Sequence, residues 1–205
     1  KTSYSSPATL PLGLAYLAGV LEKADYNVKI IDSTGEQNPI KIRRSKDNVY
    51  NLQGLTPTEI LNRIDSKTLI FGISLMFSQE WTVHRSFIGE IKKKFPKIII
   101  IAGGEHASAM PEYILKDCPS IDYVIRGEGE FSMLEFSYNL FHEKNTKNIP
   151  GICFVDKENN FGTRSSSLIA ISNSISIKQF KLPMVFRATQ YPPNMSNYRN
   201  VELNN

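Results

Sequence analysis

Cysteine, histidine and tryptophan are scarce in this 205-residue chain, which contains two, three and one of them. The two cysteines, Cys118 and Cys153, lie far apart and show none of the short spacings that bind zinc or an iron–sulfur cluster. Two thiols also make too few bridges for a disulfide-based scaffold. The sequence therefore predicts two buried structural thiols in a core built from ordinary apolar side chains.

Strong net charge and long apolar segments are also missing. The chain has 24 Lys and Arg against 20 Asp and Glu, a net charge of +4. The one dense basic run, Lys92 to Lys94, falls where the end of a helix is expected, so no basic surface for nucleic acid is indicated. No stretch is long and apolar enough to cross a membrane, and residues 1–9 do not resemble a secretion signal. We expect a cytoplasmic protein that binds neither nucleic acid nor membrane.

Several catalytic and nucleotide-binding motifs are absent. Neither G-x-G-x-x-G nor G-x-x-x-x-G-K-S/T occurs, and the closest segment carries Glu128 where a phosphate would bind. No G-x-S-x-G motif supplies a serine nucleophile. His84 and His142 fall on expected helices and are interpreted as surface residues. His106 is placed at the rim of a crevice, where it either meets a ligand or hydrogen-bonds a neighbouring loop.

The chain does contain a regular alternation of short apolar strands and amphipathic helices. Strands are expected at 69–74, 97–102 and 121–126, and helices at 56–65, 79–94, 110–116 and 130–141. Near-continuous Ile, Val and Leu in the strands require cover on both faces of a parallel sheet. The sequence therefore predicts an α/β fold with three layers, a Rossmann-like and flavodoxin-like parallel sheet between helices.

The beginning of the chain fits this alternation only in part. A helix is expected over 11–24 and a short buried strand over 28–32. A sheet of this class has a central strand before its first helix, and the polar residues 1–7 are too short to form one. We therefore expect a fragment that lacks its first strand. Residues 33–55, which show no apolar period, are interpreted as a long surface loop.

The character of the chain changes near residue 150. Residues 151–164 are predicted to form a small β-hairpin outside the main sheet. The Ser- and Asn-rich remainder is interpreted as a linker or irregular arm. These limits divide the chain into a Rossmann-like domain over 1–150 and a hairpin with linker over 151–205.

The carboxyl ends of parallel strands meet at one edge of a sheet, where folds of this class bind their ligands. Three strands are followed there by small, apolar or acidic residues: Ser74, Leu75, Met76 and Phe77; Gly103, Gly104, Glu105 and His106; and Gly127, Glu128, Gly129 and Glu130. Because glycine lacks a side chain, a ligand can approach the backbone closely at these positions. The sequence predicts a ligand crevice at this edge.

Four segments form a specific pattern when taken together: 11–18, 72–76, 103–106 with 111–112, and 126–130. As an ordered set they resemble the cobalamin-binding domain of cobalamin-dependent radical S-adenosylmethionine enzymes, over roughly residues 6–154. Cobalamin domains of the methionine synthase and mutase type carry D-x-H-x-x-G, then S-x-L, then G-G. Here Ser74 to Met76 precede the Gly103-Gly104 pair at a similar spacing.

The resemblance implies a role for each segment in binding cobalamin. Ser74 would hydrogen-bond the base of the cofactor's nucleotide tail, and the Gly103-Gly104 pair would admit the tail. Leu10, Pro11, Leu12 and Gly13 would lie against the corrin. Since Gly13 takes the place of the first motif's glycine, Leu10 stands at the position of the cobalt-ligating His, and Ala8 at that of the Asp. The resemblance therefore implies a cobalt without a protein imidazole.

The resemblance further implies that the chain belongs to a larger enzyme, most often a methyltransferase or a cyclase-type enzyme. Its iron–sulfur cluster and S-adenosylmethionine would belong to a downstream radical S-adenosylmethionine domain, the expected partner, so the chain alone should be inert. Arg126 with Glu128 or Glu130 would meet corrin amides, or else form a salt bridge and a helix cap. The alternative is a non-catalytic flavodoxin-like, receiver-like or cobalamin-sensing module. A receiver would need a cluster of acids at its strand ends, and the single Asp32 weakens that interpretation.

Overall fold

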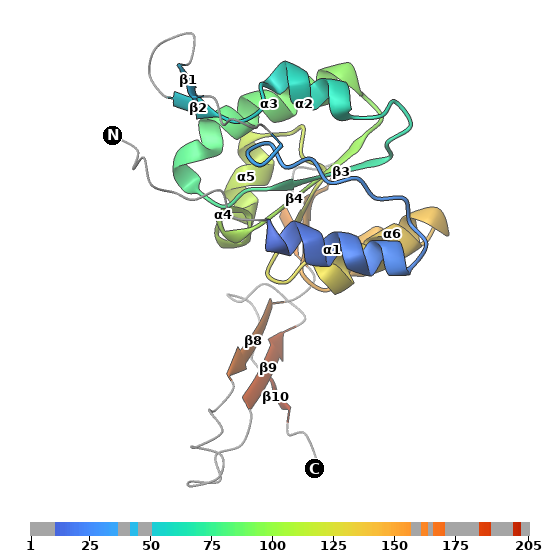
Figure 1. The fold of residues 1–205 in the computed structure, drawn as a ribbon. Coiled ribbons are helices and arrows are strands. Elements are labelled where there is room, and N and C mark those ends of the chain that lie inside the picture. The colour runs from blue at the N-terminus through green and yellow to red at the C-terminus, as the bar shows by residue number, and fades with distance from the viewer. Residues whose placement is uncertain are drawn as a thin grey trace, which may run out of the picture.

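A five-stranded mixed sheet organises the described part of the chain (Figure 1). The computed structural model describes residues 11–36, 42–44, 51–156, 161–163, 166–170, 185–189 and 199–201. The strands are β3 (Ile70–Ser74), β4 (Ile99–Gly103), β5 (Tyr123–Ile125), β6 (Ile152–Val155) and β7 (Phe161–Thr163), side by side in that order. The first three run parallel, and β6 and β7 are each antiparallel to the strand before them.

Helices cover both faces of this sheet, so the predicted three layers are confirmed (Figure 1). One face carries α1 (Leu12–Lys23) and α6 (Glu130–Phe141); the other carries α2 (Pro57–Arg63), α3 (Trp81–Lys94), α4 (Glu105–Ala109) and α5 (Pro111–Asp117). The short 3₁₀ helices η1 (Ser78–Glu80) and η2 (Thr146–Asn148) complete the described domain. In the described ranges no helix is long and apolar enough to span a membrane.

Strand β4 shows why the central strands are apolar throughout. Ile100 and Ala102 lie in the core beneath α3 and α5, whereas Ile99 and Ile101 face the core beneath α1 and α6. Successive side chains of a strand point to opposite faces, and here both faces are covered. The sequence prediction of a strand buried on both sides is confirmed.

The start of α2 follows its sequence signals. Thr56 Oγ1 accepts a hydrogen bond from Glu59 N at 3.1 Å, and Thr56 N donates to Glu59 Oε2 at 2.6 Å. This reciprocal pair satisfies two backbone donors that the first helical turn leaves free, and such caps contribute about 1 kcal/mol. The predicted cap at Thr56 and the helix start at Pro57 are therefore confirmed.

The predicted position of the 151–164 hairpin is wrong. Strand β6 pairs with β5, with Val124 opposite Cys153 and Ile125 opposite Ile152, so β6 and β7 extend the main sheet. The sheet is consequently mixed and not all parallel. The apolar pattern of a hairpin shows that its two strands pair with each other, but it does not show which distant strand offers a free edge.

The predicted strand at 28–32 is also absent, since these residues lie outside any strand. A strand needs a partner for its backbone groups, and none of the described strands is paired with this segment. Val28 and Ile31 still pack against the two cores, which explains their apolar character. The residues before α1, where the first strand is predicted to be missing, lie outside the described residues.

Two further segments carry strands where the sequence predicted irregular chain. The expected loop at 33–55 contains β1 (Ile42–Arg44) antiparallel to β2 (Asn51–Gln53). The expected linker contains β8 (Ser166–Ala170), β9 (Val185–Thr189) and β10 (Arg199–Val201), which form an antiparallel sheet. The domain limit near residue 150 stays a prediction, although β6 continues the main sheet across it.

Candidate functional site

The carboxyl ends of β3, β4 and β5 lie at one edge of the sheet, because the three strands are parallel. Ser74 is the register partner of Gly103, and Leu75 N donates to Gly103 O at 2.7 Å. The residues that follow β3 and β4 therefore leave the sheet side by side. The sequence-predicted segments 74–77, 103–106 and 127–130 are brought together at this edge.

The two central glycines have different roles. Gly104 adopts a φ of +97°, and a Cβ placed there would lie 2.7 Å from Leu75 O and 3.1 Å from Met76 Sδ. The fold itself therefore requires glycine at position 104, because the backbone of Leu75 lies too close for a side chain there. A Cβ on Gly103 would meet only Ile125 O, at 3.9 Å. Gly103 therefore leaves room at the strand exits, with only an ordinary van der Waals contact at its Cβ position, which Gly104 does not.

The exit of β5 is tied to α4 through Ser108. Ser108 Oγ accepts from Gly127 N at 2.9 Å, and Ser108 O accepts from Arg126 Nε at 3.2 Å. Gly127 has a φ of +72°, which suits glycine at a turn. A Cβ added there would meet no atom within 4 Å, so no neighbouring group packs against this position. Glu128 is exposed, and Glu130 opens α6, where an acidic side chain offsets the helix dipole.

Helix α1 begins beside this exit. A Cβ on Gly129 would lie 3.3 Å from Leu17 Cδ1, which places the first half of α1 against the β5 exit. Pro11 is the N-cap, and its carbonyl accepts from Ala15 N at 3.0 Å. Gly13 has no atom within 4 Å of a Cβ position. Leu10 and Ala8, also predicted to matter here, lie outside the described residues.

Large apolar side chains remain exposed around the strand exits. Their exposed fractions range from 45% to 82% in a set that we call the apolar rim: Leu12, Met76, Phe77 and Phe131. Met76 and Phe77 follow β3, Leu12 opens α1, and Phe131 lies in the first turn of α6. Phe131 also lines a groove beside Tyr26. Isolated exposed apolar residues are common, whereas larger exposed apolar surfaces are typical of sites that bind an apolar ligand or partner.

His106 lies directly behind the crevice and is buried, with 4% of its surface exposed. Its backbone N donates to Leu75 O at 3.0 Å, and its Nδ1 lies 2.9 Å from Ser78 Oγ. Its Nε2 is buried without a hydrogen-bond partner among the described residues. Burial, reinforced by the nearby His84, lowers the pKa of His106. The hydrogen bond to a neighbouring loop, one of its two predicted uses, is observed; contact with a ligand stays a prediction.

The other two histidines lie elsewhere. His84 on α3 is 3.4 Å from Glu80 Oε2, and exposed His142 follows the carboxyl end of α6, where its Nδ1 lies 2.8 Å from Tyr138 O. The surface interpretation is confirmed for His142, whereas His84 is partly buried. Within the described ranges, no three His, Cys, Asp or Glu side chains gather to hold a metal ion.

Trp81 and Asp117 form a polar support under His106. Trp81 Nε1 donates to Asp117 Oδ2 at 2.8 Å, and Arg85 Nη1 contacts both carboxylate oxygens at 2.9 Å. The Trp81 hydrogen bond is the main cause that lowers the pKa of Asp117, and Arg85 adds to it. The ring centroid of Trp81 lies 5.7 Å from that of His106. This network holds α3 against α5 behind the crevice.

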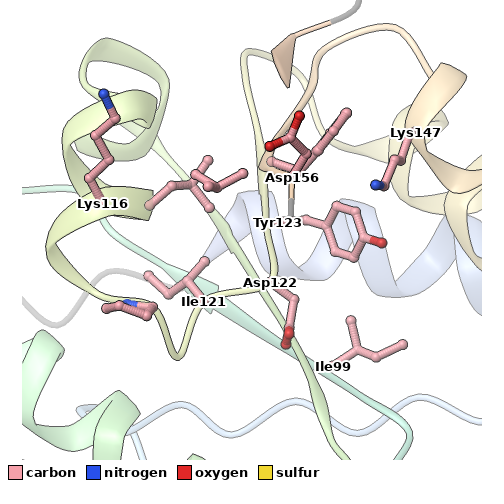
Figure 2. Close-up of a pocket in the computed structure, with 11 residues that line it drawn as sticks. Ile99, Lys116, Ile121, Asp122, Tyr123, Lys147 and Asp156 are labelled. Atoms are coloured by element: carbon pink, nitrogen blue, oxygen red, sulfur yellow. The ribbon is translucent and has the colours of Figure 1, made fainter. Parts of the chain in front are cut away.

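A pocket of about 640 Å³ lies at the opposite edge of the sheet, where β4 and β5 begin. Lys116 and Lys147 lie on opposite sides of it (Figure 2). Two of its charged side chains already have partners. Lys92 Nζ and Ile100 N both donate to Asp122 Oδ2 at 2.8 Å, and Lys147 Nζ lies 4.8 Å from the Phe154 ring centroid. None of the predicted site residues lines this pocket.

Residues 6–136 match the sequence family described as the B12 binding domain. The match spans more than half of the chain and contains all the strand exits described above. The chain belongs to the B12-binding domain family. Its crevice residues Ser74, Gly103 and Gly127 therefore lie within a domain whose family is defined by cobalamin binding.

Curated relatives of this B12-binding domain are methyltransferases and cyclases. Cytidylyl-2-hydroxyethylphosphonate methyltransferase of Streptomyces wedmorensis is 30% identical over 151 residues, which cover 73% of this chain and 28% of the relative. An uncharacterised methyltransferase of Pyrococcus horikoshii is 31% identical over 150 residues, with the same coverage. Anaerobic magnesium-protoporphyrin IX monomethyl ester cyclase of Synechocystis is 28% identical over 147 residues, covering 70% and 26%. The chain thus spans little more than a quarter of these relatives.

Solved structures with the same fold include two cobalamin enzymes. The radical S-adenosylmethionine methyltransferase TsrM from Kitasatospora setae, with cobalamin and a 4Fe-4S cluster bound, aligns with a TM-score of 0.58 at 20% identity over 77% of this chain and 28% of its own. OxsB, with aqua-cobalamin and S-adenosylmethionine bound, aligns with a TM-score of 0.59 at 22% identity, over 83% and 21%. At these identities the likeness shows the fold, and the predicted resemblance to cobalamin-dependent radical S-adenosylmethionine enzymes is confirmed.

The comparisons leave the roles of individual residues as predictions. The sequence predicts the strand exits but not Ser78 and Ser108, which connect them, or Trp81, which joins α3 to α5. Their partners lie between 19 and 36 positions away in the chain. No local sequence signal predicts such contacts.

Proposed function

We propose that this chain binds cobalamin at the strand exits, as the cofactor-binding part of a larger radical S-adenosylmethionine enzyme. The observation that carries the proposal is the room at Gly103, where an added Cβ would meet only Ile125 O at 3.9 Å, between the exits of β3 and β5 in a chain of the B12-binding family. Relatives that are methyltransferases and cyclases support an enzyme of one of these two kinds.

The residues present fit such a cofactor. Gly103 gives space for a narrow polar tail, and the partly exposed Ser74 beside it offers a hydroxyl for one hydrogen bond. A neutral hydrogen bond contributes only about 1 kcal/mol net. The apolar rim must therefore supply most of the affinity, at about 25 cal/mol for each Å² removed from water.

Bound cobalamin supplies methyl-transfer or radical chemistry, and the protein's part is to bind it and to exclude other ligands of the metal. His106 is buried and engaged with Ser78, so its Nε2 does not face the crevice surface. His84 and His142 lie on the flank of α3 and at the far end of α6. The arrangement supports the expectation that no protein imidazole ligates the cobalt.

A substitution at Gly103 tests the placement. Gly103→Leu would make only an ordinary contact at its Cβ, with Ile125 O at 3.9 Å, so the fold should persist while cobalamin binding is weakened. An intruding side chain costs about 1–3 kcal/mol, which predicts binding of hydroxocobalamin weakened about 5- to 150-fold. Equilibrium titration followed by visible absorbance measures this change.

Gly89→Leu is the matched control, because a Cβ on Gly89 of α3 would meet no atom within 4 Å and Gly89 lies away from the strand exits. The control should bind cobalamin like the unsubstituted chain. Unchanged affinity in Gly103→Leu, with its fold intact by circular dichroism, would disprove the placement. The proposal of a radical S-adenosylmethionine parent is tested separately, by looking for a C-x-x-x-C-x-x-C motif in the remainder of the encoding gene.

A further inference from the structure

His106 connects α4 to the segment that leaves β3, and it does so at two points. Its backbone N donates to Leu75 O at 3.0 Å, and its Nδ1 lies 2.9 Å from Ser78 Oγ. Met76 and Phe77 lie between these two contacts, and both belong to the exposed apolar rim. One residue, through its backbone N and its side chain, thus contacts both sides of this part of the loop.

The imidazole is held in place on its other side as well. It is buried, and Trp81, itself anchored by its hydrogen bond to Asp117, lies 5.7 Å away between ring centroids. The lowered pKa keeps the ring neutral near neutral pH. A neutral imidazole carries a single N–H, on either Nδ1 or Nε2.

The surroundings of the two nitrogens favour one tautomer. A proton on Nε2 would leave a buried donor with no partner among the described residues. A proton on Nδ1 is used in the contact with Ser78, and Nε2 is then only an unpaired acceptor. Buried donors without partners are rarer in proteins than underused acceptors. The contact is therefore assigned as His106 Nδ1–H donating to Ser78 Oγ.

We propose that His106 is a positioning residue that, as its Nδ1–H tautomer, holds Ser78 and thereby fixes Met76 and Phe77 in the orientation that receives the cofactor. The effect on cobalamin rests on the proposed function, but the tautomer and the order of the loop are properties of the chain alone. Ser78 becomes a further residue of the site, although the sequence gives it no motif.

Nuclear magnetic resonance of the ligand-free 205-residue chain tests the positioning directly. The ¹⁵N shifts of His106 should identify a protonated Nδ1. In Ser78→Ala and in His106→Leu, the backbone order parameters of Met76 and Phe77 should fall from about 0.85 to below about 0.6. Ser86→Ala, at an exposed serine of α3, is the matched control and should leave them unchanged.

Conservative substitutions separate positioning from simple packing. Asn carries its amide on the same carbon that carries Nδ1 in histidine, so His106→Asn should keep the contact with Ser78 and preserve the order of the loop. His106→Gln places its amide one carbon farther, near the position of Nε2, and should not. Loss of one neutral hydrogen bond should weaken hydroxocobalamin binding about 5-fold in Ser78→Ala, and the double variant with His106→Leu should bind no more weakly than His106→Leu alone.

The results distinguish this proposal from the proposed function. A protonated Nε2, or unchanged order at Met76 and Phe77 in Ser78→Ala, would overturn the positioning role even if cobalamin binds. An unsubstituted chain that fails to bind cobalamin would refute the proposed function, while the tautomer and the order parameters would still decide the role of His106. Ser78 is exposed, so Ser78→Ala keeps the test valid if His106→Leu fails to fold.

Discussion

Gly104→Ala should strongly destabilise the domain, whereas Gly103→Ala should not. Gly104 has φ +97° and ψ 179°, a region of backbone space that is almost exclusive to glycine and costs another residue about 1–3 kcal/mol. The new methyl group would also lie 2.7 Å from Leu75 O. Relieving an overlap of this kind costs about 1–3 kcal/mol more. The expected loss is therefore about 2–6 kcal/mol, out of a typical stability of about 5–15 kcal/mol.

The adjacent glycine provides the comparison. An added Cβ on Gly103 has Ile125 O at 3.9 Å as its nearest neighbour, which is an ordinary contact. Since alanine loses less backbone freedom on folding than glycine, Gly103→Ala should change stability by less than about 1 kcal/mol, most simply in the stabilising direction.

Urea denaturation of both variants, followed by far-ultraviolet circular dichroism, measures the two free energies of unfolding. Cobalamin is left out, so that the assay reports on the chain alone. Equal stabilities for the two variants, or a cost below about 1 kcal/mol for Gly104→Ala, would refute the assignment of Gly104 to the backbone and Gly103 to the ligand.

Four other outcomes are expected. Burial raises the pKa of the Cys118 thiol, and Cys153 is buried too, so a thiol reagent at neutral pH should modify neither in the native chain and both in urea. The pKa of His106 is lower in the folded chain than in the unfolded chain, so its contribution to stability is complete above about pH 6.5 and should be lost as the pH falls through the folded-state pKa. In pH-dependent denaturation, His106→Asn should lack this part of the loss. The cobalt(II) paramagnetic spectrum of the loaded chain should show no nitrogen splitting from the protein; splitting that vanishes in His106→Ala would make His106 the ligand and contradict the assignment of Leu10. Iron analysis after anaerobic reconstitution should find no stoichiometric iron in the 205-residue chain, and stoichiometric iron would show that the cluster site is misjudged.

The local pattern of the sequence was sufficient for a strand buried on both faces and for a long helix with one buried side. Strand β4 and helix α6 were predicted within two residues because their apolar periods are long and the adjacent turns contain Gly or Pro. Pairing was less predictable. The apolar run at 28–32 was taken for a strand, although a strand depends on a neighbour that the run itself does not specify. The same reason explains why β6 was not assigned to the main sheet.

The candidate site was predictable to the extent that it follows from parallel topology. Once β3, β4 and β5 are parallel, their exits must meet, and Gly103 is found where a ligand needs space. The contact of His106 with Ser78 could not be predicted, because it joins residues 28 positions apart through side-chain orientation. The different structural roles of Gly103 and Gly104 could not be predicted either, because the sequence shows only that both residues are glycine.

Trp81 gives the domain an optical reporter of its own. It is the single tryptophan of the chain, it is buried, and its ring lies beside His106 on the inner side of the crevice. All indole emission therefore comes from one known position. A corrin at the strand exits absorbs at the wavelengths where buried indole emits, so energy transfer should quench this emission in proportion to occupancy. Binding by any variant can then be followed at micromolar concentration without a label.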